Sequence, residues 1–451
     1  MSICEVTLWS LVSTAWNVLL DCDETFNYWE PLHYLTYGYG LKPWEYDSKY
    51  ALRPYAFLYI LWIPCLVMKW MRVPKWAVFY ACKFILAFVN LYSLSLLSPL
   101  YNAAPGIIAQ ASAFLPNSLA CTLGAWILRF WRMQKPNKML FVMAFMTIVT
   151  WPYSIVFYAA FALFMQSKFS FQLYRYMIAG LFAIVYIVFP VMMIDNFHYN
   201  KWTLSWLNAI LYNIIGGNDG RFGVEGPYFY VLNGLLNYNL IFLSSLLPLD
   251  FNLERVLSIL SFALLSSRPH KEERFLYPLI PLMLTTSGKK LMRFFHPLMI
   301  LFTVWRLYSV FLFYGAPQKI FLSARLSKTD VLCMKDQWYR FPSHFLLSDG
   351  ARIGFTDDMQ FSGALPQYYH DRFAIYNDQN KASPTQYTDT KECTLYFGLR
   401  QEYPQLKALS CRRLLIANKT KAPYRWLYFF TDEKNYVWDD LCLFEKTSDA
   451  S

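Results

Sequence analysis

The sequence predicts a mainly α-helical, polytopic transmembrane bundle, followed by a small mixed α/β domain outside the bilayer. Of its 451 residues, 56% are apolar and only 16% are charged, whereas soluble domains carry about 25% charged residues. Long apolar runs recur through residues 1–316 and are missing from residues 317–451. The net charge of +11 resides mainly in short loops, which is typical of oriented membrane helices rather than of nucleic-acid binding.

The apolar runs predict the membrane segments in chain order. A helix perpendicular to the bilayer needs about 20 apolar residues, so several runs are short for a full crossing. The first run lacks a cleavage-site pattern and therefore predicts a retained span rather than a removed signal peptide. The runs cover residues 4–20, 54–68, 76–98, 105–128, 139–165, 177–194, 227–249, 256–268, 276–288 and 297–316.

Loop charges predict the orientation of these segments. Four loops carry Lys and Arg without any acidic residue, and the positive-inside rule places such loops in the cytosol; they are 69–75, 129–138, 166–176 and 287–296. Three loops contain acidic residues and long aromatic-rich stretches, and we expect them on the lumenal side; they are 21–53, 195–226 and 267–275.

The run 139–165 lies between two loops that are both predicted to be cytosolic, so it cannot be a single crossing. At its midpoint stands "TWPYS", Thr150 to Ser154, and Pro152 disfavours one straight helix. We therefore predict two short segments that meet near Trp151 and Pro152, with backbone buried in protein or lining a cavity. The count becomes about eleven membrane segments, with a cytosolic N-terminus and a lumenal tail.

Residues 317–451 predict a small mixed α/β domain, because apolar stretches alternate there with Gly and Pro and the charges nearly balance. Four cysteines in this tail allow one or two disulfides in an oxidising compartment, with the pairing open; they are Cys333, Cys393, Cys411 and Cys442. The other five cysteines are interpreted as packing residues. Asn418 begins an Asn-Lys-Thr acceptor triplet for glycosylation.

Two polar stretches predict the chemistry. "DCDETFNYWEP", residues 21–31, follows the first apolar run, and "SRPHKEERFLYP", residues 267–278, joins two later runs. A carboxylate can accept a hydroxyl proton, while Lys, Arg and His can stabilise a phosphate leaving group. Since charges near bilayer level usually face a cavity, a partner or a substrate, we predict a lumenal site for a phosphorylated, hydroxyl-rich substrate.

Two further stretches add polar side chains on the same predicted face. They are "DNFHYNKW", residues 195–202, and "EGPYFYVLNGLLNYN", in which Tyr228, Asn233 and Asn237 are predicted to share one helical stripe.

A structural interpretation stands beside each of these. Glu30, Glu45 and Asp47 fit solvated or ion-paired roles, His33 fits an ordinary interfacial histidine, and residues 270–274 fit a self-neutralised ion-pair patch. Acids and histidines coexist, yet their spacing matches no defined metal motif, so no metal is expected. The sequence contains neither a P-loop nor GxGxxG, and a nucleotide site has no local support.

Five stretches carry a family resemblance. They are "DCDETFNYWEPLHYLTYGYGLKPWEYDSKYALRPYAFLY", "HKEERFLYP", "SAFLPNS", "GPYFYVLNGLLNYN" and "QWYRFPSHFLLSDG". Together they resemble glycosyltransferase family 22, whose members are polytopic enzymes of the endoplasmic reticulum (ER) in the GT-C class. The likeness is greatest to the α-1,2-mannosyltransferases that build the lipid-linked precursor of N-glycans.

The resemblance implies a reaction. Such members move mannose from dolichyl-phosphate-β-D-mannose to dolichyl-diphosphate-linked oligomannose in the ER lumen, adding the seventh and ninth residues. A β donor and an α product imply one inverting displacement. The donor is a substrate, and no cofactor or nucleic-acid partner is implied. The resemblance makes 1–316 the catalytic membrane region and 317–451 a lumenal domain.

The resemblance also assigns residues. It implies that Asp23 is the base that activates the acceptor 2-hydroxyl and that Glu24 orients the site or serves as the alternative base. Contacts to the donor phosphate and the wall of a sugar or lipid site are implied for two further groups; they are Arg53, His270, Lys271 and Arg274, and then Phe26, Tyr28, Trp29, His33 and Tyr228.

Three alternatives stay open. The first is a GPI-anchor α-1,2-mannosyltransferase of the same family. The second is an inactive member, because the chain is shorter than typical members between residues 83 and 110 and between 250 and 266. The third is a transporter, which predicts internal repeats that this sequence lacks.

Overall fold

The structure is a computed structural model that describes residues 2–165, 173–215, 223–247, 252–324, 326–356, 364–369 and 376–446. The chain forms two compact units, each assembled from separate parts of the sequence. The first unit comprises Met1–Ala15, Glu45–Ile60 and Lys83–Val304, and the second comprises Trp16–Trp44, Leu61–Cys82 and Trp305–Ser451. Helices α4 (Tyr55–Trp70), α5 (Lys75–Ser95) and α17 (Lys289–Tyr314) contribute several residues to each unit, and the last residue of α1, Trp16, belongs to the second unit.

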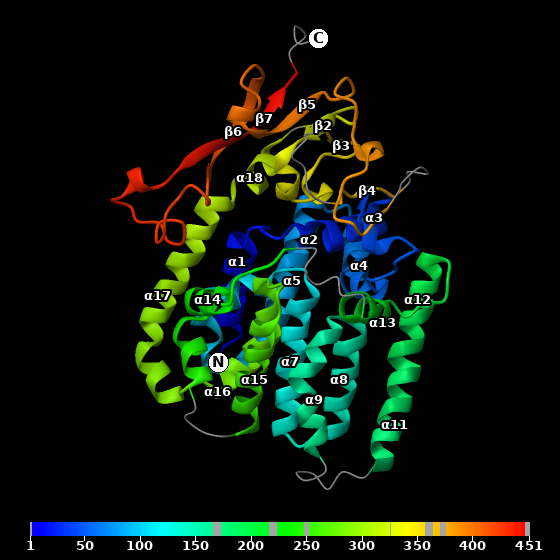
Figure 1. Ribbon diagram of the computed structural model, residues 1–451, viewed down its shortest axis with the longest axis vertical. Helices are drawn as coiled ribbons and strands as arrows, with labels where there is room; N and C mark the ends of the chain where they lie inside the picture. The colour runs from blue at the N-terminus through cyan, green and yellow to red at the C-terminus, as the bar shows by residue number, and fades with distance from the viewer. Residues whose placement is uncertain are drawn as a thin grey trace. The chain divides into compact units, whose positions relative to one another are not determined.

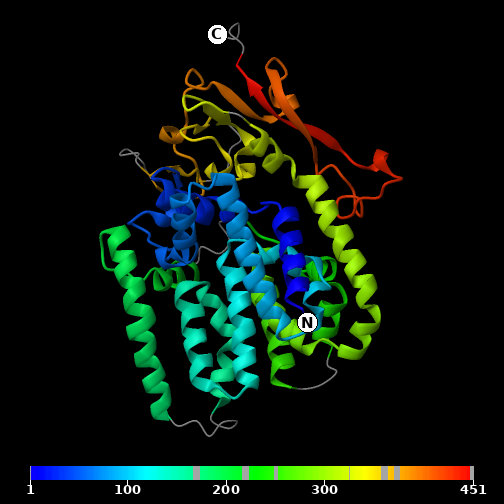
Figure 2. The same ribbon diagram turned by 180° about the vertical axis from the view of Figure 1, so that it is seen from behind.

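The first unit is built from helices that pack through apolar faces. Helices α7, α8 and α9 lie side by side in both views (Figures 1 and 2), and α14 packs against α15 and α16. Its longer helices are α1 (Ile3–Trp16), α6 (Pro105–Ala111), α7 (Pro116–Arg132), α8 (Pro136–Val149), α9 (Ile155–Leu163), α11 (Leu173–Ala183), α12 (Phe189–Tyr199), α13 (Ser205–Ile210), α14 (Phe229–Leu246), α15 (Leu253–Ser267) and α16 (Ile280–Thr286).

Short 3₁₀ and π segments join these helices. They are η2 (Trp44–Tyr46), η3 (Pro99–Asn102), η4 (Pro152–Ser154), η5 (Ile184–Val188), η6 (Leu211–Ile215) and η8 (Glu273–Leu279).

Among the described residues, four helical stretches are long and apolar enough to cross a membrane. They are Lys75–Ser95, Tyr174–Tyr199, Phe229–Leu246 and Met292–Tyr314. The pair formed by α6 and α7 would add a fifth if it is one broken span. A mostly helical chain with several apolar helices and a small sheet is thus confirmed, while the count of eleven segments and their orientation stay predictions.

The predicted break near Trp151 and Pro152 is confirmed. Helix α8 ends at Val149, and Trp151 is extended, with φ −111° and ψ 103°. An extended conformation is what a following proline imposes on the residue before it. The 3₁₀ turn η4 then leads into α9, which lies beside α8 (Figure 1).

Two predicted boundaries are wrong. The run 105–128 is not one segment, because α6 ends at Ala111 and α7 starts at Pro116 after a bend of 110°. Pro116 lacks an amide hydrogen and holds Leu115 extended, which stops a continuous helix. The predicted loop 287–296 is largely helical, since α17 begins at Lys289. Its basic residues mark a polar helix end, and charge alone does not terminate a helix.

The second unit combines short helices with a five-stranded mixed sheet in the order β3-β2-β5-β7-β6. Strand β2 pairs in parallel with β3 and β5, while β7 runs antiparallel to β5 and β6. Helix α18 (Ala316–Ser323) packs on β6 and β7. The strands are β2 (Val331–Met334), β3 (Arg352–Phe355), β5 (Leu395–Leu399), β6 (Lys407–Leu415) and β7 (Trp438–Glu445).

A second, two-stranded sheet pairs β1 (Leu41–Lys42) with β4 (Gln367–Tyr368). The remaining elements of this unit are α2 (Cys22–Glu24), η1 (Thr25–Trp29), α3 (Glu30–Tyr37), η9 (Asp336–Arg340), η10 (His344–Leu346), η11 (Pro384–Gln386), η12 (Arg400–Glu402) and η13 (Glu433–Asn435).

Two disulfides cross-link the five-stranded sheet and resolve the open pairing of the tail cysteines. Cys333 on β2 bonds to Cys393, and Cys411 on β6 bonds to its register partner Cys442 on β7. Of the five free cysteines, Cys65, Cys82 and Cys121 are buried as packing residues. The packing interpretation is wrong for Cys4, which is exposed at the first turns of α1, and Cys22 is only half-buried.

Replacing the Cys333–Cys393 pair by serines should lower the free energy of unfolding by about 2–4 kcal/mol, because the bond closes a long loop in the unfolded chain. Thermal unfolding of the purified variant measures this change. Cys4→Ser is the matched control, since Cys4 is exposed and free. An unchanged unfolding midpoint in the double variant would contradict the pairing.

Candidate active site

The stretch "DCDETFNYWEP" forms one helix, residues 22–37, which we call the acid-bearing helix. The Asp21 carboxylate caps it by accepting the Asp23 amide at 2.9 Å, and Gly38 ends it with φ +87°. Between these ends, the amide of Glu30 donates to the Thr25 carbonyl five residues back. In a regular α-helix the amide of residue 31 would donate to the carbonyl four residues back. Pro31 has no amide hydrogen and cannot make that bond, so its position favours the π turn. Such turns inside α-helices frequently mark functional sites.

The two predicted acids have different environments. Asp23 lies half-buried in the first turn of the helix. Glu24 is only 3% exposed, and its Oε1 accepts the indole N–H of Trp29 at 2.9 Å. Asp23 is therefore the more exposed of the two acids and Glu24 is held by a hydrogen bond, while the catalytic roles predicted for them stay predictions.

The aromatic side chains of the acid-bearing helix are core residues of the second unit. Phe26 stacks on Trp338 with ring centroids 5.6 Å apart, and Trp29 lies 4.5 Å from Phe79. Tyr28 is also buried. Packing thus accounts for all three, and their predicted contact with a sugar or lipid stays untested.

Glu30 is fully buried and pairs with the His344 ring, so the predicted ion-paired role is confirmed and the solvated alternative is wrong at this position. Its Oε1 accepts the Ser343 hydroxyl and the His344 amide, each at 2.8 Å. Its Oε2 accepts the His344 ring Nδ1–H at 2.6 Å and the Leu41 amide at 3.1 Å. Burial raises the pKa of Glu30, but the His344 ring and amide outweigh burial and hold this pKa at about 2.

His33 lies one turn beyond Glu30 and is buried, so the interfacial interpretation is wrong. Burial, with repulsion from His344, holds the pKa of His33 well below its usual range. The neutral ring donates from Nδ1 to the Tyr39 carbonyl at 2.7 Å. This bond ties the end of the acid-bearing helix to the chain that follows it.

The segment 268–275 in the first unit gathers opposite charges. His270 places Nδ1 2.9 Å from the Gly223 carbonyl and Nε2 2.9 Å from the Glu272 carboxylate. Because both ring nitrogens face acceptors, the doubly protonated imidazolium is favoured, and the Glu272 hydrogen bond raises the pKa of His270. Glu272 also pairs with the Arg274 guanidinium. Although burial raises the pKa of Glu272, these two cations lower it to about 2.

Two neighbours complete this segment. Lys271 is buried and donates to the Glu225 carbonyl at 3.0 Å, and Glu273 accepts the Asn237 amide at 2.9 Å. Together with Arg268, four cations therefore stand against two carboxylates in segment 268–275, so ion pairing within the segment leaves a positive excess that suits an anion.

Arg53 and Tyr228, predicted for the same site, lie in other surroundings of the first unit. The Arg53 guanidinium is 3.6 Å from the buried Glu45 carboxylate, and its carbonyl accepts the Tyr199 hydroxyl. Tyr228 precedes α14 and is 74% exposed, whereas Asn237 inside that helix is 6% exposed. The predicted common stripe is therefore wrong for Tyr228.

Asp195, from the stretch "DNFHYNKW", is a buried helix residue rather than a loop residue. Its carboxylate accepts the Tyr55 amide at 2.9 Å and the Ser205 hydroxyl at 2.5 Å. It anchors the start of α4 and the start of α13. Sequence reasoning placed Asp195 in a lumenal loop because the apolar run stops just before it.

Two further candidate sites, one for a metal ion and one for glycosylation, rest on fewer observations. Single ligand atoms of Asp21, Cys22 and Asp23 lie within 4.8 Å of one another, but acidic groups commonly do so without an ion, and we assign no metal.

The glycosylation triplet that starts at Asn418 lies in a turn. Asn418 is exposed, while Thr420 of the same triplet is buried and hydrogen-bonded to the backbone of Ile416 and Val437. The Asn418 side chain is thus accessible to a modifying enzyme.

Comparison with known protein families gives the class of this protein, which is a glycosyltransferase. More specifically, residues 3–348 match the model of the Alg9-like mannosyltransferase family, and the chain belongs to that family. The family predicted from the sequence motifs, and with it a mannosyltransferase, is confirmed.

Similar proteins extend across most of the chain. The chain is 29% identical to the mouse α-1,2-mannosyltransferase ALG9 over 83% of its length and 74% of that protein. It is 29% identical to the ALG9 protein of Saccharomyces cerevisiae, with 81% and 76% covered. The GPI mannosyltransferase 3 of Candida albicans is 22% identical, with 62% of each chain covered. No solved structure matches.

His344→Ala should lower the free energy of unfolding by about 3–5 kcal/mol, because it removes the ring that pairs with the buried Glu30 carboxylate and leaves three of its four hydrogen bonds. Chemical denaturation of the purified protein measures the change. His296→Ala, a half-buried histidine elsewhere, is the control. If His344→Ala and His296→Ala lowered the free energy of unfolding equally, the result would contradict a special role for the Glu30–His344 pair.

The low pKa of Glu30 also predicts a pH dependence. The ionised carboxylate adds stability that is fully present above pH 4.5, the usual pKa, and is lost as pH falls toward 2. Wild type should therefore lose more stability than Glu30→Gln between about pH 5 and pH 3. Asp47→Asn, a half-buried acid of the same loop, should follow wild type; parallel curves for wild type and Glu30→Gln would refute the assignment.

Proposed function

We propose that this protein transfers mannose from dolichyl-phosphate-β-D-mannose, in α-1,2 linkage, to dolichyl-diphosphate-linked oligomannose. The observation that carries the proposal is similarity to several α-1,2-mannosyltransferases named ALG9 over more than four-fifths of this chain. The acceptors would receive their seventh and ninth mannose, for protein N-glycosylation.

The proposed mechanism is one inverting displacement. The acceptor 2-hydroxyl oxygen attacks C1 of the donor mannose, and the bond from C1 to the phosphate oxygen breaks. Dolichyl phosphate leaves with the electron pair, and the hydroxyl proton passes to Asp23. The half-buried position of Asp23 supports its role as base. The hydrogen bond from Trp29 supports Glu24 as a fixed, orienting carboxylate.

The leaving phosphate gains negative charge as the bond breaks, so nearby cations lower the barrier. We assign this role to His270, Lys271 and Arg274, with Arg53 as a further contact. The positive excess of segment 268–275 and the imidazolium form of His270 support the assignment. Glu272 would hold both His270 and Arg274 in place.

We further propose that the protein resides in the ER membrane, with 1–316 as the catalytic membrane region and 317–451 as a lumenal domain. Two disulfides in residues 317–451 support a lumenal location for this domain, because disulfides persist in oxidising compartments. The GPI-anchor alternative is weaker, since the relative with that name is less similar and covers less of the chain.

Asp23→Asn should reduce mannose transfer at least about 100-fold, because the variant cannot accept the hydroxyl proton. The assay uses purified protein, dolichyl-phosphate mannose and lipid-linked acceptors that carry six or eight mannoses. Asp47→Asn, from the same loop, should keep wild-type activity. Transfer by Asp23→Asn with loss in Glu24→Gln would move the base to Glu24. No transfer by folded wild type to either acceptor would refute the proposed function.

Arg274→Gln should raise KM for the donor about tenfold or more and leave KM for the acceptor unchanged, because charged hydrogen bonds to phosphate contribute strongly to binding. Steady-state kinetics with each substrate varied in turn measures both constants. Arg268→Gln is the matched control, since Arg268 is an exposed arginine in the same segment. Equal effects of the two variants would contradict a specific phosphate contact.

A further inference from the structure

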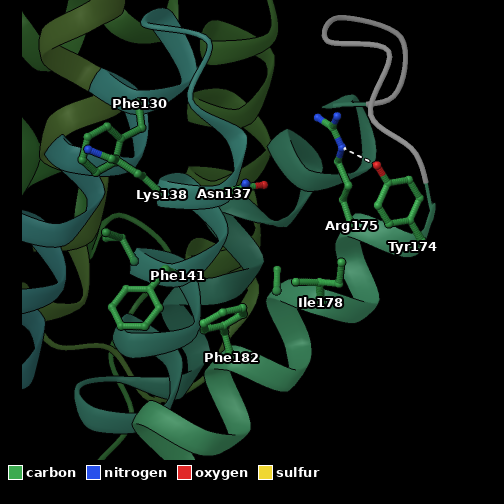
Figure 3. A pocket seen from close by; sticks show the side chains of 10 residues that line it. Phe130, Asn137, Lys138, Phe141, Tyr174, Arg175, Ile178 and Phe182 are labelled. Carbon is green, nitrogen blue, oxygen red and sulfur yellow. Dashed lines mark hydrogen bonds between the residues drawn. The ribbon is translucent and has the colours of Figure 1, made fainter.

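A groove of about 630 Å³ opens in the first unit, among helices α7, α8 and α11 (Figure 3). Its volume falls within the roughly 300–1,000 Å³ that ligand pockets occupy. It includes no residue of the candidate active site. The residues that line it are Phe130, Asn137, Lys138, Phe141, Val142, Tyr174, Arg175, Ile178, Ala179 and Phe182.

One part of the groove is apolar. Phe141 of α8 and Phe182 of α11 point into the same hollow, with Ile178 beside them (Figure 3). These three side chains are 43%, 51% and 48% exposed. Their exposed area is therefore available to an apolar chain inserted between the two helices.

The other part of the groove is polar and cationic. Lys138 lies in the first turn of α8 and Arg175 in the first turn of α11, and Asn137 points between them (Figure 3). The Lys138 ammonium lies 6.0 Å from the Phe130 ring centre, and the Arg175 Nε–H donates to the Tyr174 hydroxyl at 3.3 Å. No carboxylate stands among the described lining residues. This end of the groove therefore attracts an anion.

We propose that this groove binds one anionic glycerophospholipid of the cytosolic leaflet. Its phosphate would lie between Lys138 and Arg175, and an acyl chain would run along Phe141, Ile178 and Phe182. Arg175 and Phe182 are seven residues apart on a helical path, which is roughly 10 Å, so head and chain contacts have the spacing of a lipid. Basic pockets between membrane helices on the cytosolic side bind anionic lipid headgroups.

Charge and position favour this occupant. Lys138 and Arg175 lie in the stretches 129–138 and 166–176, which hold basic residues and no acids and are therefore predicted to face the cytosol. The structure places both residues in first turns of helices at the ends of these stretches. The proposed catalytic loops contain acids and are predicted to face the lumen. The bound lipid would accordingly be a membrane phospholipid rather than a dolichyl substrate.

Native mass spectrometry of the full-length purified protein tests the proposal. Phosphatidylinositol and phosphatidylcholine with identical acyl chains are added separately, and the fraction of protein that retains one lipid is measured. Wild type should prefer phosphatidylinositol about tenfold, given what two cations contribute beside an anionic lipid. The Lys138→Gln, Arg175→Gln double variant should lose this preference. Ala179→Trp should reduce retention of the lipid by filling the groove without a charge change.

The control is the Arg132→Gln, Lys135→Gln double variant, which removes two exposed cations from the same loop region outside the groove lining. It should keep the wild-type preference. An equal loss in this control would overturn the site in favour of a general electrostatic effect. Absence of a preference in wild type would overturn the proposal, as would displacement of phosphatidylinositol by equimolar polyprenyl phosphate.

Discussion

One buried carboxylate organises the part of the molecule that carries the proposed base. Glu30 accepts four hydrogen bonds, two from His344 and one each from Ser343 and Leu41. Because an unpaired carboxylate in this position would be very costly, the acid-bearing helix and the chain more than 300 residues later must form together. The pair therefore restricts the orientation of the helix on which Asp23 and Glu24 lie.

The local structure of that helix follows from the same restriction. The π turn ahead of Pro31 aligns the aromatic side chains for burial, and the Asp21 cap holds the first turn. Glu24 is thereby locked by Trp29, while Asp23 stays accessible. The neighbouring acids Asp23 and Glu24 thus have distinct environments, set by burial and hydrogen bonding rather than by residue type.

Sequence reasoning succeeded where the cause is local. Pro152 breaks its helix whatever surrounds it, and the break was predictable from one residue. The bend at Pro116 had the same cause, yet it was missed because the apolar run continued through it. The role of Glu30 could not be predicted, since its partner lies far along the chain. The resemblance motif "QWYRFPSHFLLSDG", which contains His344, was the one signal that could have pointed to it.

The sequence by itself determined the mainly helical class, the family and the identity of the acidic and cationic motifs, because composition, helix-breaking prolines and motif wording are properties of neighbouring residues. Only the tertiary structure decided which carboxylates are buried, which cysteines pair, and which histidine has a raised or a lowered pKa. His270 faces two acceptors and His33 faces one, although both are histidines in polar motifs. Such differences depend on desolvation and on partners brought together by folding, which no local pattern encodes.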